Sequence, residues 1–368
     1  MPADLNQIPM HQPLVHALTK CAKLLRMLPF LLIIFSAACG GKSGPDVSDI
    51  NISLETSRFE QDFFSLDTNS FDQSLAALSK KYPVFFPDFV EKVLGLPPLE
   101  AGMPETQEML KQFLSDYRPV KDSADKVFKN IDKYHRETLE GLKHVKHYFP
   151  QYNTPEKLIT FIGPMDAYFE ASTGGYGDAL TTNALIVGLQ LHLGSKFSMY
   201  TSEMGQALYP AYISRKFAPE YIPVNCIKNV IDDMYPENTT GKTLVEKMVE
   251  KGKRLYLLDK LMPNTADTLK IGYTDKQLKG CYENEGLIWN FILTNSLAFN
   301  TDPSVIKGYI GEAPNTPELG EGSPGYIGLF IGKRIVEKFM EKNDDMQPDS
   351  LMRMNSKTIF EQSKYRPK

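Results

Sequence analysis

The stretch ALIVGLQL, residues 184–191, decides which kind of fold this chain can form. It is apolar along its length, which is typical of a strand that is buried on both faces. A second candidate strand, KLITFI at residues 157–162, precedes it. Residues 50–66 begin with polar and apolar side chains in alternation, which indicates a third, short strand. These segments predict a small sheet.

Most of the remaining sequence has the spacing of helices, with apolar residues three or four positions apart. The expected helices cover residues 71–80, 106–117, 127–149, 243–258 and 287–299, and a last long helix opens after Ser323-Pro324-Gly325. The helix at 287–299 should be buried on nearly all sides around Trp289, and Gly328 and Gly332 should let the last helix pack closely. We predict a predominantly helical α+β fold with a small sheet, in one domain over residues 48–368.

Residues 1–38 have the plan of a secretory signal. Lys20, Lys23 and Arg26 precede the apolar run MLPFLLIIF at residues 27–35, which is followed by the small residues 36–38. The apolar run is about half as long as a membrane-spanning helix requires. The segment therefore indicates a signal peptide, and not a transmembrane span.

Cys39 follows the small residues Ser36-Ala37-Ala38 and precedes Gly40. This pattern fits a lipoprotein signal peptidase, and it predicts that the Cys39 thiol carries a diacylglyceryl group with palmitate-type acyl chains. Several such chains on one residue hold a protein firmly at a membrane. Residues 40–47 (GGKSGPDV) read as a flexible tether, because they are rich in Gly, Ser and Pro.

The composition of the mature chain, residues 39–368, limits its partners. It holds 38 Lys and Arg against 44 Asp and Glu, which gives a net charge of about −6. Because phosphate binding needs a basic surface, nucleic acid is not expected as a partner. Two cysteines, Cys226 and Cys281, remain besides Cys39. They can pair in an oxidising compartment or stay free and buried, and they form no clustered thiol motif for a metal.

Several residue patterns resemble active-site motifs, but each has a simpler interpretation. His144 and His147 are spaced for a shared metal on a helix, yet lack a third ligand, so we interpret them as surface histidines. The glycines of residues 174–177 (GGYG) indicate a turn, because the Lys-Ser/Thr of a phosphate loop is absent. His192 should be a structural histidine at a strand end. Two acidic pairs are weak candidates for acid–base catalysis: Asp232 with Asp233, and Glu283 with Glu285.

Short segments over nearly the whole mature chain resemble the gliding motility lipoprotein GldB family of Bacteroidetes. The matching segments are residues 52–64 (ISLETSRFEQDFF), 81–87 (KYPVFFP), 147–150 (HYFP), 185–194 (LIVGLQLHLG), 210–213 (PAYI), 244–263 (LVEKMVEKGKRLYLLDKLMP), 284–289 (NEGLIW), 323–328 (SPGYIG) and 363–367 (SKYRP). The resemblance implies a component of the gliding apparatus and of the associated type IX secretion machinery. In these bacteria an acidic cluster after the lipidated cysteine often accompanies surface display. No such cluster follows Cys39, which favours a periplasm-facing domain.

The GldB family is also distantly similar to zinc peptidases with an HExxH helix, which implies a zincin-like core. Residues 224–235 (VNCIKNVIDDMY) would correspond to that helix, with Asn229 and Asp233 at the histidine positions and Val230 at the position of the general base. Glu250 would stand for the later acidic ligand. Without both histidines and the base, zinc hydrolysis lacks its ligands and its proton acceptor. The resemblance therefore implies a pseudoenzyme with no metal and no other cofactor.

These observations lead to one main hypothesis and two alternatives. We expect a non-catalytic component of the cell envelope, held at a membrane by a lipid on Cys39 and working with envelope protein partners. The first alternative is a metal-dependent, peptidase-like hydrolase that uses Asp232, Asp233, Glu250 and Glu285. The second is a binding module for a peptide or a glycan in the inherited cleft.

Overall fold

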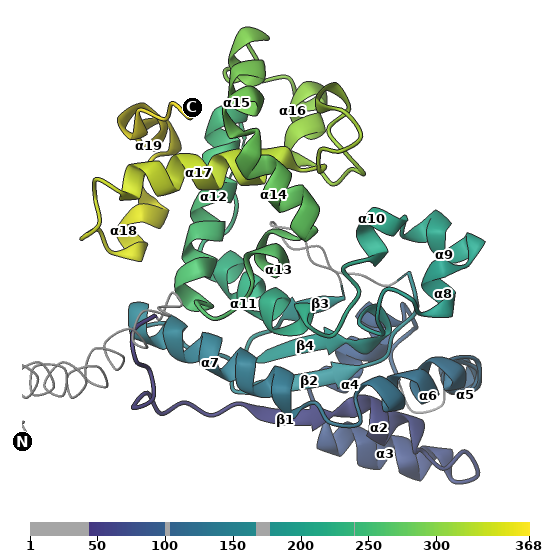
Figure 1. Cartoon of the computed structure of the whole chain (residues 1–368). Helices are drawn as coiled ribbons and strands as arrows, with labels where there is room; N and C mark the ends of the chain where they lie inside the picture. Colours follow the sequence, from purple (N-terminus) through teal and green to yellow (C-terminus); the bar gives the residue numbers. More distant parts are fainter. Residues whose placement is uncertain (1–43, 100–103, 167–176, 239) are drawn as a thin grey trace, which may run out of the picture. The chain divides into compact units, whose positions relative to one another are not determined.

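The structure is a computed structural model that describes residues 44–99, 104–166, 177–238 and 240–368. Its centre is a mixed sheet in the order β1-β2-β4-β3 (Figure 1). The strands are β1 (Glu55–Arg58), β2 (Lys157–Phe161), β3 (Asp178–Leu180) and β4 (Ala184–Gly188). The first, second and fourth run parallel, whereas β3 is antiparallel to β4 and forms one edge. The structure confirms the three predicted strands and adds β3.

The predicted strand at residues 184–191 stops at Gly188, where the chain turns into the 3-10 helix η3 (Leu189–Leu191). The Gly188 N–H donates to the carbonyl of Gly177 at 2.7 Å. A Cβ on Gly188 would lie 2.6 Å from that same oxygen, so only glycine permits this close approach. All five residues of β4 are buried, as its apolar sequence predicts.

Helices make up most of the remaining described structure. The helices before β2 are α2 (Phe59–Phe64), α3 (Phe71–Lys81), α4 (Phe85–Asp88), the π-helical turn η2 (Phe89–Val93), α5 (Pro104–Asp116), α6 (Arg118–Val127) and α7 (Asp132–Tyr148). The helices after η3 are α8 (Ser198–Thr201), α9 (Glu203–Leu208), α10 (Ala211–Ser214), α11 (Tyr221–Met234), α12 (Leu244–Leu261), α13 (Asp267–Ile271), α14 (Asp275–Glu283), α15 (Glu285–Thr294), α16 (Pro303–Ile310), the 3-10 helix η4 (Pro317–Leu319), α17 (Ile327–Met340), α18 (Pro348–Arg353) and α19 (Ser356–Ser363). The structure therefore confirms a mainly helical α+β fold.

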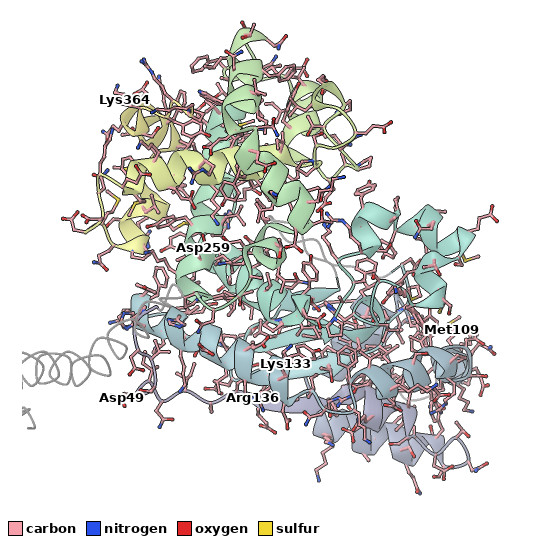
Figure 2. The ribbon with its side chains drawn as sticks, viewed as in Figure 1. Asp49, Met109, Lys133, Arg136, Asp259 and Lys364 are labelled. Atoms are coloured by element: carbon pink, nitrogen blue, oxygen red, sulfur yellow. The ribbon has the colours of Figure 1, made fainter. Side chains whose placement is uncertain are left out.

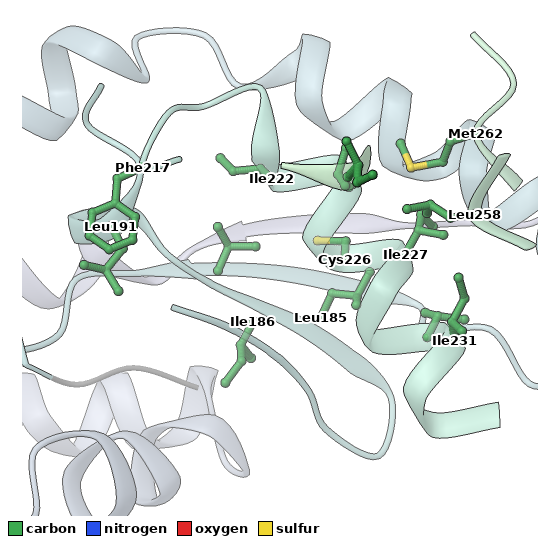
Figure 3. Close-up of a cluster of buried hydrophobic side chains, with 14 of the residues drawn as sticks. Leu185, Ile186, Leu191, Phe217, Ile222, Cys226, Ile227, Ile231, Leu258 and Met262 are labelled. Atoms are coloured by element: carbon green, nitrogen blue, oxygen red, sulfur yellow. The ribbon is translucent and has the colours of Figure 1, made fainter. Parts of the chain in front are cut away.

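The two faces of the sheet are covered by different helices. Figure 3 shows Leu185 of β4 beside Cys226 and Ile231 of α11, and Ile186 pointing to the opposite face of the strand. Successive residues of a strand point to opposite faces. Since both of these side chains are buried, both faces of β4 are covered. Helix α2 packs against β2, where Phe59 forms an aromatic cluster with Phe85 and Phe89 at ring distances of 4.9 Å.

Helices α12 and α17 form the most extensive helix–helix contact (Figure 1). A Cβ on Gly332 would lie 1.7 Å from the carbonyl oxygen of Met248, and a Cβ on Gly252 would lie 2.2 Å from the Gly332 carbonyl. The two backbones therefore touch at a pair of glycines, which confirms the close packing predicted for Gly332. Thr243 and Glu246 form a capping box at the start of α12, which fixes where that helix begins.

Two predictions about helices are wrong. The single helix expected at residues 127–149 begins only at Asp132, because α6 ends at Val127 and the chain turns before α7. In this turn the Asn130 side chain accepts the Asp132 N–H at 2.7 Å. Helix α15 is not buried on all sides. Trp289 packs on Tyr365 with their ring centroids 5.2 Å apart, but Leu287 is 70% exposed on the uncovered side.

None of the helices in the described residues is both long and apolar enough to span a bilayer. Cys39 and residues 1–43 as a whole lie outside the described part of the chain, as do Gly174, Gly175 and Tyr176 of the predicted turn. The compact unit begins at Gly44, within the segment expected to be a tether.

Candidate functional site

Helices α11 and α12 carry all the positions that the peptidase resemblance singles out. Val230 is fully buried, whereas Asn229 is half-buried and Asp233 is exposed. The Tyr152 hydroxyl donates to the Asp233 carboxylate at 2.7 Å, which ties the end of α11 to the loop before β2. Asp233 therefore serves as a surface anchor in this structure.

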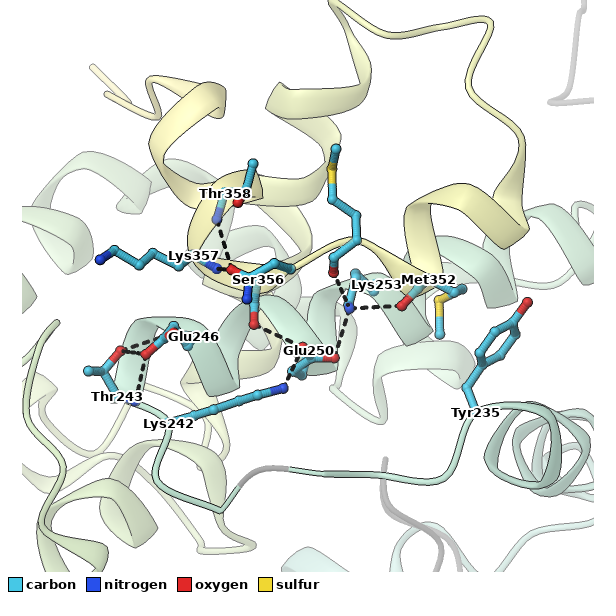
Figure 4. A network of polar contacts seen from close by, with 12 residues as sticks. Tyr235, Lys242, Thr243, Glu246, Glu250, Lys253, Met352, Ser356, Lys357 and Thr358 are labelled. Atoms are coloured by element: carbon cyan, nitrogen blue, oxygen red, sulfur yellow. Dashed lines mark hydrogen bonds and ion pairs between the residues drawn. The ribbon is translucent and has the colours of Figure 1, made fainter.

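Glu250 lies in a different polar network (Figure 4). Its carboxylate accepts hydrogen bonds from Lys242 and from Ser356 of α19, both at 2.8 Å, and it pairs with Lys253 at 2.9 Å. Burial pushes the pKa of Glu250 upward, but the Lys242 hydrogen bond and the Lys253 charge outweigh it, so the pKa lies below its ordinary value. Glu250 is thus an ionised carboxylate that holds α19 against α12.

Asp233 and Glu250 share no partner, so the described contacts do not gather Asn229, Asp233 and Glu250 into one site. Within residues 44–99, 104–166, 177–238 and 240–368, no three His, Cys, Asp or Glu side chains are placed to hold a metal ion. This geometry gives no observation in favour of metal-assisted hydrolysis at these positions.

A different acid of α11, Asp232, interacts with α12. Lys228 and Asp232 lie one turn apart, and Asp232 forms an ion pair of 2.6 Å with Arg254 of α12. The Arg254 guanidinium also donates to the carbonyl of Tyr235. The polar face of α11 is therefore shifted by one residue from the Asn229 and Asp233 positions.

Lys228 is the most unusual ionisable group of this region, since its side chain is only 3% exposed. Burial lowers its pKa to about 7, with a further lowering by the charge of Lys216, while Glu312 and Asp232 oppose the shift. Lys216 and Glu312 form an ion pair of 2.5 Å. The sequence offered one signal for this residue, a lysine between the apolar residues Ile227 and Val230 of the helix.

A second polar group, the buried histidine network, connects β3 to α11. The His192 Nε2 lies 2.9 Å from the Asp178 carboxylate, and its Nδ1 lies 3.3 Å from the carbonyl of Ala218. The Asn225 amide donates to the same carboxylate at 2.8 Å. Because both ring nitrogens have partners, His192 is a structural histidine, as predicted.

The two cysteines in the described part of the mature chain, Cys226 and Cys281, are free and buried. Burial raises the pKa of Cys226 well above its ordinary value, and it raises the pKa of Cys281 to about 12. Both groups are therefore thiols at neutral pH, whereas the thiolate is the nucleophilic form. This chemistry disfavours cysteine catalysis at either residue.

The remaining candidate residues are the acids Glu283 and Glu285 and the histidines His144 and His147. None of their described contacts indicates a catalytic role. Glu285 pairs with Arg334 at 3.0 Å and accepts the Tyr365 hydroxyl at 2.7 Å, whereas Glu283 is exposed. His147 is exposed as predicted. The expectation of a surface position is wrong for His144, which is 2% exposed because the chain around Gly44 and Pro263 covers it.

The described structure contains several cavities. One of about 370 Å³ lies between α14, α15 and residues 319–327, and one of about 300 Å³ lies beside α7 and the end of α12. Another, of about 490 Å³, lies between α3, η2, Leu99 and Gln107. The first is lined by residues of the segments NEGLIW and SPGYIG. His144 lines the second, and its Nδ1 makes no hydrogen bond with any described residue.

Comparison with known proteins identifies the family of the chain. Residues 40–367 match the family described as Gliding motility protein GldB. No match was found among curated proteins or among solved structures. Since the match covers far more than half of the sequence, the chain belongs to the GldB family of gliding motility lipoproteins.

Proposed function

We propose that this protein is a non-catalytic, lipid-anchored component of the cell envelope that works with the gliding or type IX secretion machinery and faces the periplasm. The observation that carries the proposal is the family match over residues 40–367. The match begins directly after Cys39, the residue that the small residues 36–38 mark for lipidation. A lipid at that cysteine would hold the domain at a membrane.

The non-catalytic part of the proposal is supported by the carboxylates of the competing hydrolase hypothesis. Asp232 is paired with Arg254, Glu250 with Lys253 and Glu285 with Arg334. For Glu250, the neighbouring cations also hold the pKa below its ordinary value, so this carboxylate is a poor proton acceptor. Each of these acids thus has a role in holding helices together.

The resemblance to zinc peptidases implies that two consecutive helices supply two histidines and an acid. Helices α11 and α12 follow one another and pack together, and β3 lies against α11. Asp233 and Glu250 lie in separate contacts, however, and α11 carries no histidine. The described contacts therefore do not assemble the ligand set that zinc hydrolysis would need.

The envelope role can be tested by capturing the lipidated protein from cross-linked cells. We expect envelope proteins of the gliding or secretion machinery to be recovered with the wild-type protein. The Cys39→Ser variant should be released from the membrane and should recover them poorly. Recovery of a monomer without envelope partners from the wild type would contradict the proposal.

A separate measurement addresses the hydrolase alternative. Metal analysis of the purified protein should find no stoichiometric zinc, and the Asp233→Ala variant should give the same result. Stoichiometric zinc in the wild type that disappears in Asp233→Ala would overturn the non-catalytic proposal.

A further inference from the structure

The first described residue of the chain, Gly44, is seated on the folded domain. A Cβ at Gly44 would lie 2.8 Å from Cγ of Pro263 and 3.1 Å from Cε1 of His144. Val47, three residues later, is only 8% exposed. The segment from Gly44 onward is thus packed on α7 and on the loop after α12. We call the contact of Gly44 with His144 and Pro263 the tether seat.

The tether seat limits how far the domain can move from its lipid. Gly44 is the fifth residue after Cys39, and an extended chain spans at most about 3.6 Å per residue. The contour length from the lipidated residue to the seat is therefore at most about 18 Å.

The length of α12 shows which part of the domain lies far from the tether seat. Pro263 follows the last turn of α12, whereas at the first turn the Leu244 N–H donates to the carbonyl of Asn300 and the Val245 N–H to that of Ala298. The 18 residues of this helix span about 27 Å at 1.5 Å per residue. Phe299 is therefore about 27 Å from the seat along the helix axis, which exceeds the reach of the tether.

We propose that the membrane surface meets the tether-seat end of the domain, so that the second half of α7 and the end of α12 face phospholipid headgroups. The Phe299 end of α12 then points away from the membrane. This inference rests on the lipid anchor of the proposed function, and it adds the orientation of the domain.

The side chains around the seat are polar, as a surface that lies on headgroups and does not enter the acyl region requires. His147 and Lys260 are exposed there, and both can hydrogen-bond to phosphate. The exposed carboxylate of Glu140 lies beside them and accepts the Asn264 amide. The large exposed apolar side chains of the described structure lie elsewhere, for example Met204, Leu287 and Phe299. An inserting surface would need such residues at the seat.

The orientation can be measured by energy transfer from a fluorophore to headgroup-labelled lipid in vesicles of phosphatidylethanolamine and phosphatidylglycerol. The full lipidated protein is labelled at His147→Cys, near the seat, or at Phe299→Cys, at the far end. Cys226 and Cys281 are buried thiols and should remain unlabelled, which the unsubstituted protein checks. We expect strong transfer from position 147 and much weaker transfer from position 299. Equal transfer, or stronger transfer from position 299, would overturn the orientation.

A second variant tests whether the seat sets this orientation. Leucine at Gly44 cannot fit against Pro263 and His144, so Gly44→Leu should reduce the difference between the two labelled positions. Gly308→Leu is the matched control, because a Cβ there meets no heavy atom within 4 Å, and it should keep the full difference. An undiminished difference in Gly44→Leu would refute the role of the seat.

The Cys39→Ser protein separates failure of the orientation from failure of the anchor. We expect it to stay off the vesicles and to give no transfer from either position. If it binds the vesicles as the wild type does, the proposed lipid anchor fails, and the orientation inference fails with it. If the wild type alone binds but transfers equally from both positions, only the orientation fails.

Discussion

Replacing Gly332 by alanine would place a methyl group inside the contact between α12 and α17. The new Cβ would lie 1.7 Å from the Met248 carbonyl oxygen, whereas real Cβ atoms essentially never come within 3.0 Å of another heavy atom. The helices would therefore have to separate by at least about 1.3 Å, a value that follows from these two distances. The obstacle is backbone on a buried helix, so no side chain can rotate away.

The expected loss of stability follows from this separation. Overpacking that side chains can absorb costs about 1–3 kcal/mol, and a rigid backbone obstacle lies at or above the upper end of that range. Alanine regains up to about 1 kcal/mol of helix propensity relative to glycine. We expect Gly332→Ala to lower the free energy of unfolding by about 2 kcal/mol or more, a large part of the 5–15 kcal/mol typical of a folded protein.

Urea unfolding followed by circular dichroism would measure this loss on the mature protein. Gly308→Ala is the control, because Gly308 lies in the interior of α16 and a Cβ there would meet no neighbour. The control should gain about 0.5–1 kcal/mol from helix propensity alone. Equal stability of the two variants would refute the argument that the glycine pair sets the helix contact.

Three further changes test the polar groups. Because the folded pKa of Lys228 is about 7 and its unfolded pKa about 10.5, the unfolded state binds more protons between these values. Stability should therefore rise by up to about 1.4 kcal/mol per pH unit between pH 7 and 10, and urea midpoints of Lys228→Met should lose that slope. Glu285→Ala should lower the free energy of unfolding by about 1–3 kcal/mol and Glu283→Ala by less than about 1 kcal/mol, as urea titrations at neutral pH can check. His192→Ala should cost about 3–5 kcal/mol because it leaves the buried Asp178 carboxylate with the Asn225 amide but without the imidazole. Adding Asp178→Asn should restore part of this loss in a double-mutant cycle.

The parts of the fold that the sequence predicted are those with a strong local pattern. The continuous apolar run of β4 and the stripe of Ile327, Ile331, Ile335 and Phe339 on α17 mark buried surfaces directly, and all of these α17 residues are fully buried. The glycine at position 332 was informative because a glycine inside an apolar helix usually has a packing reason.

The features that the sequence did not predict depend on contacts between distant segments. Strand β3 has three residues and is held by β4 and α11, so no local pattern marks it. His144 is buried by Gly44 and Pro263, which lie about 100 residues before it and about 120 residues after it. The exposed side of α15 carries Leu287 and Leu293 beside its polar residues, so apolar periodicity could not separate it from the covered side.

The sequence also did not determine which residues of α11 face α12. The resemblance to zinc peptidases singled out Asn229 and Asp233 of α11, whereas the acid of α11 that pairs with α12 is Asp232. One residue corresponds to a rotation of about 100° around a helix, so a register error of one moves a residue to another face. Only the position of α12 in space distinguishes the two registers.

The parallel pairing of β1 with β2 has a consequence for how the chain reaches its final shape. Glu55 pairs with Lys157, so about 100 residues must be synthesised and brought together before this part of the sheet can close. Contacts between such distant segments form slowly, since the entropy of closing a long loop is lost before the contact is gained. A chain that is exported before it folds benefits from this delay, because its first strand has no partner until residues 157–160 are available. The sheet topology thus leaves β1 without a strand partner until the chain has been made as far as β2.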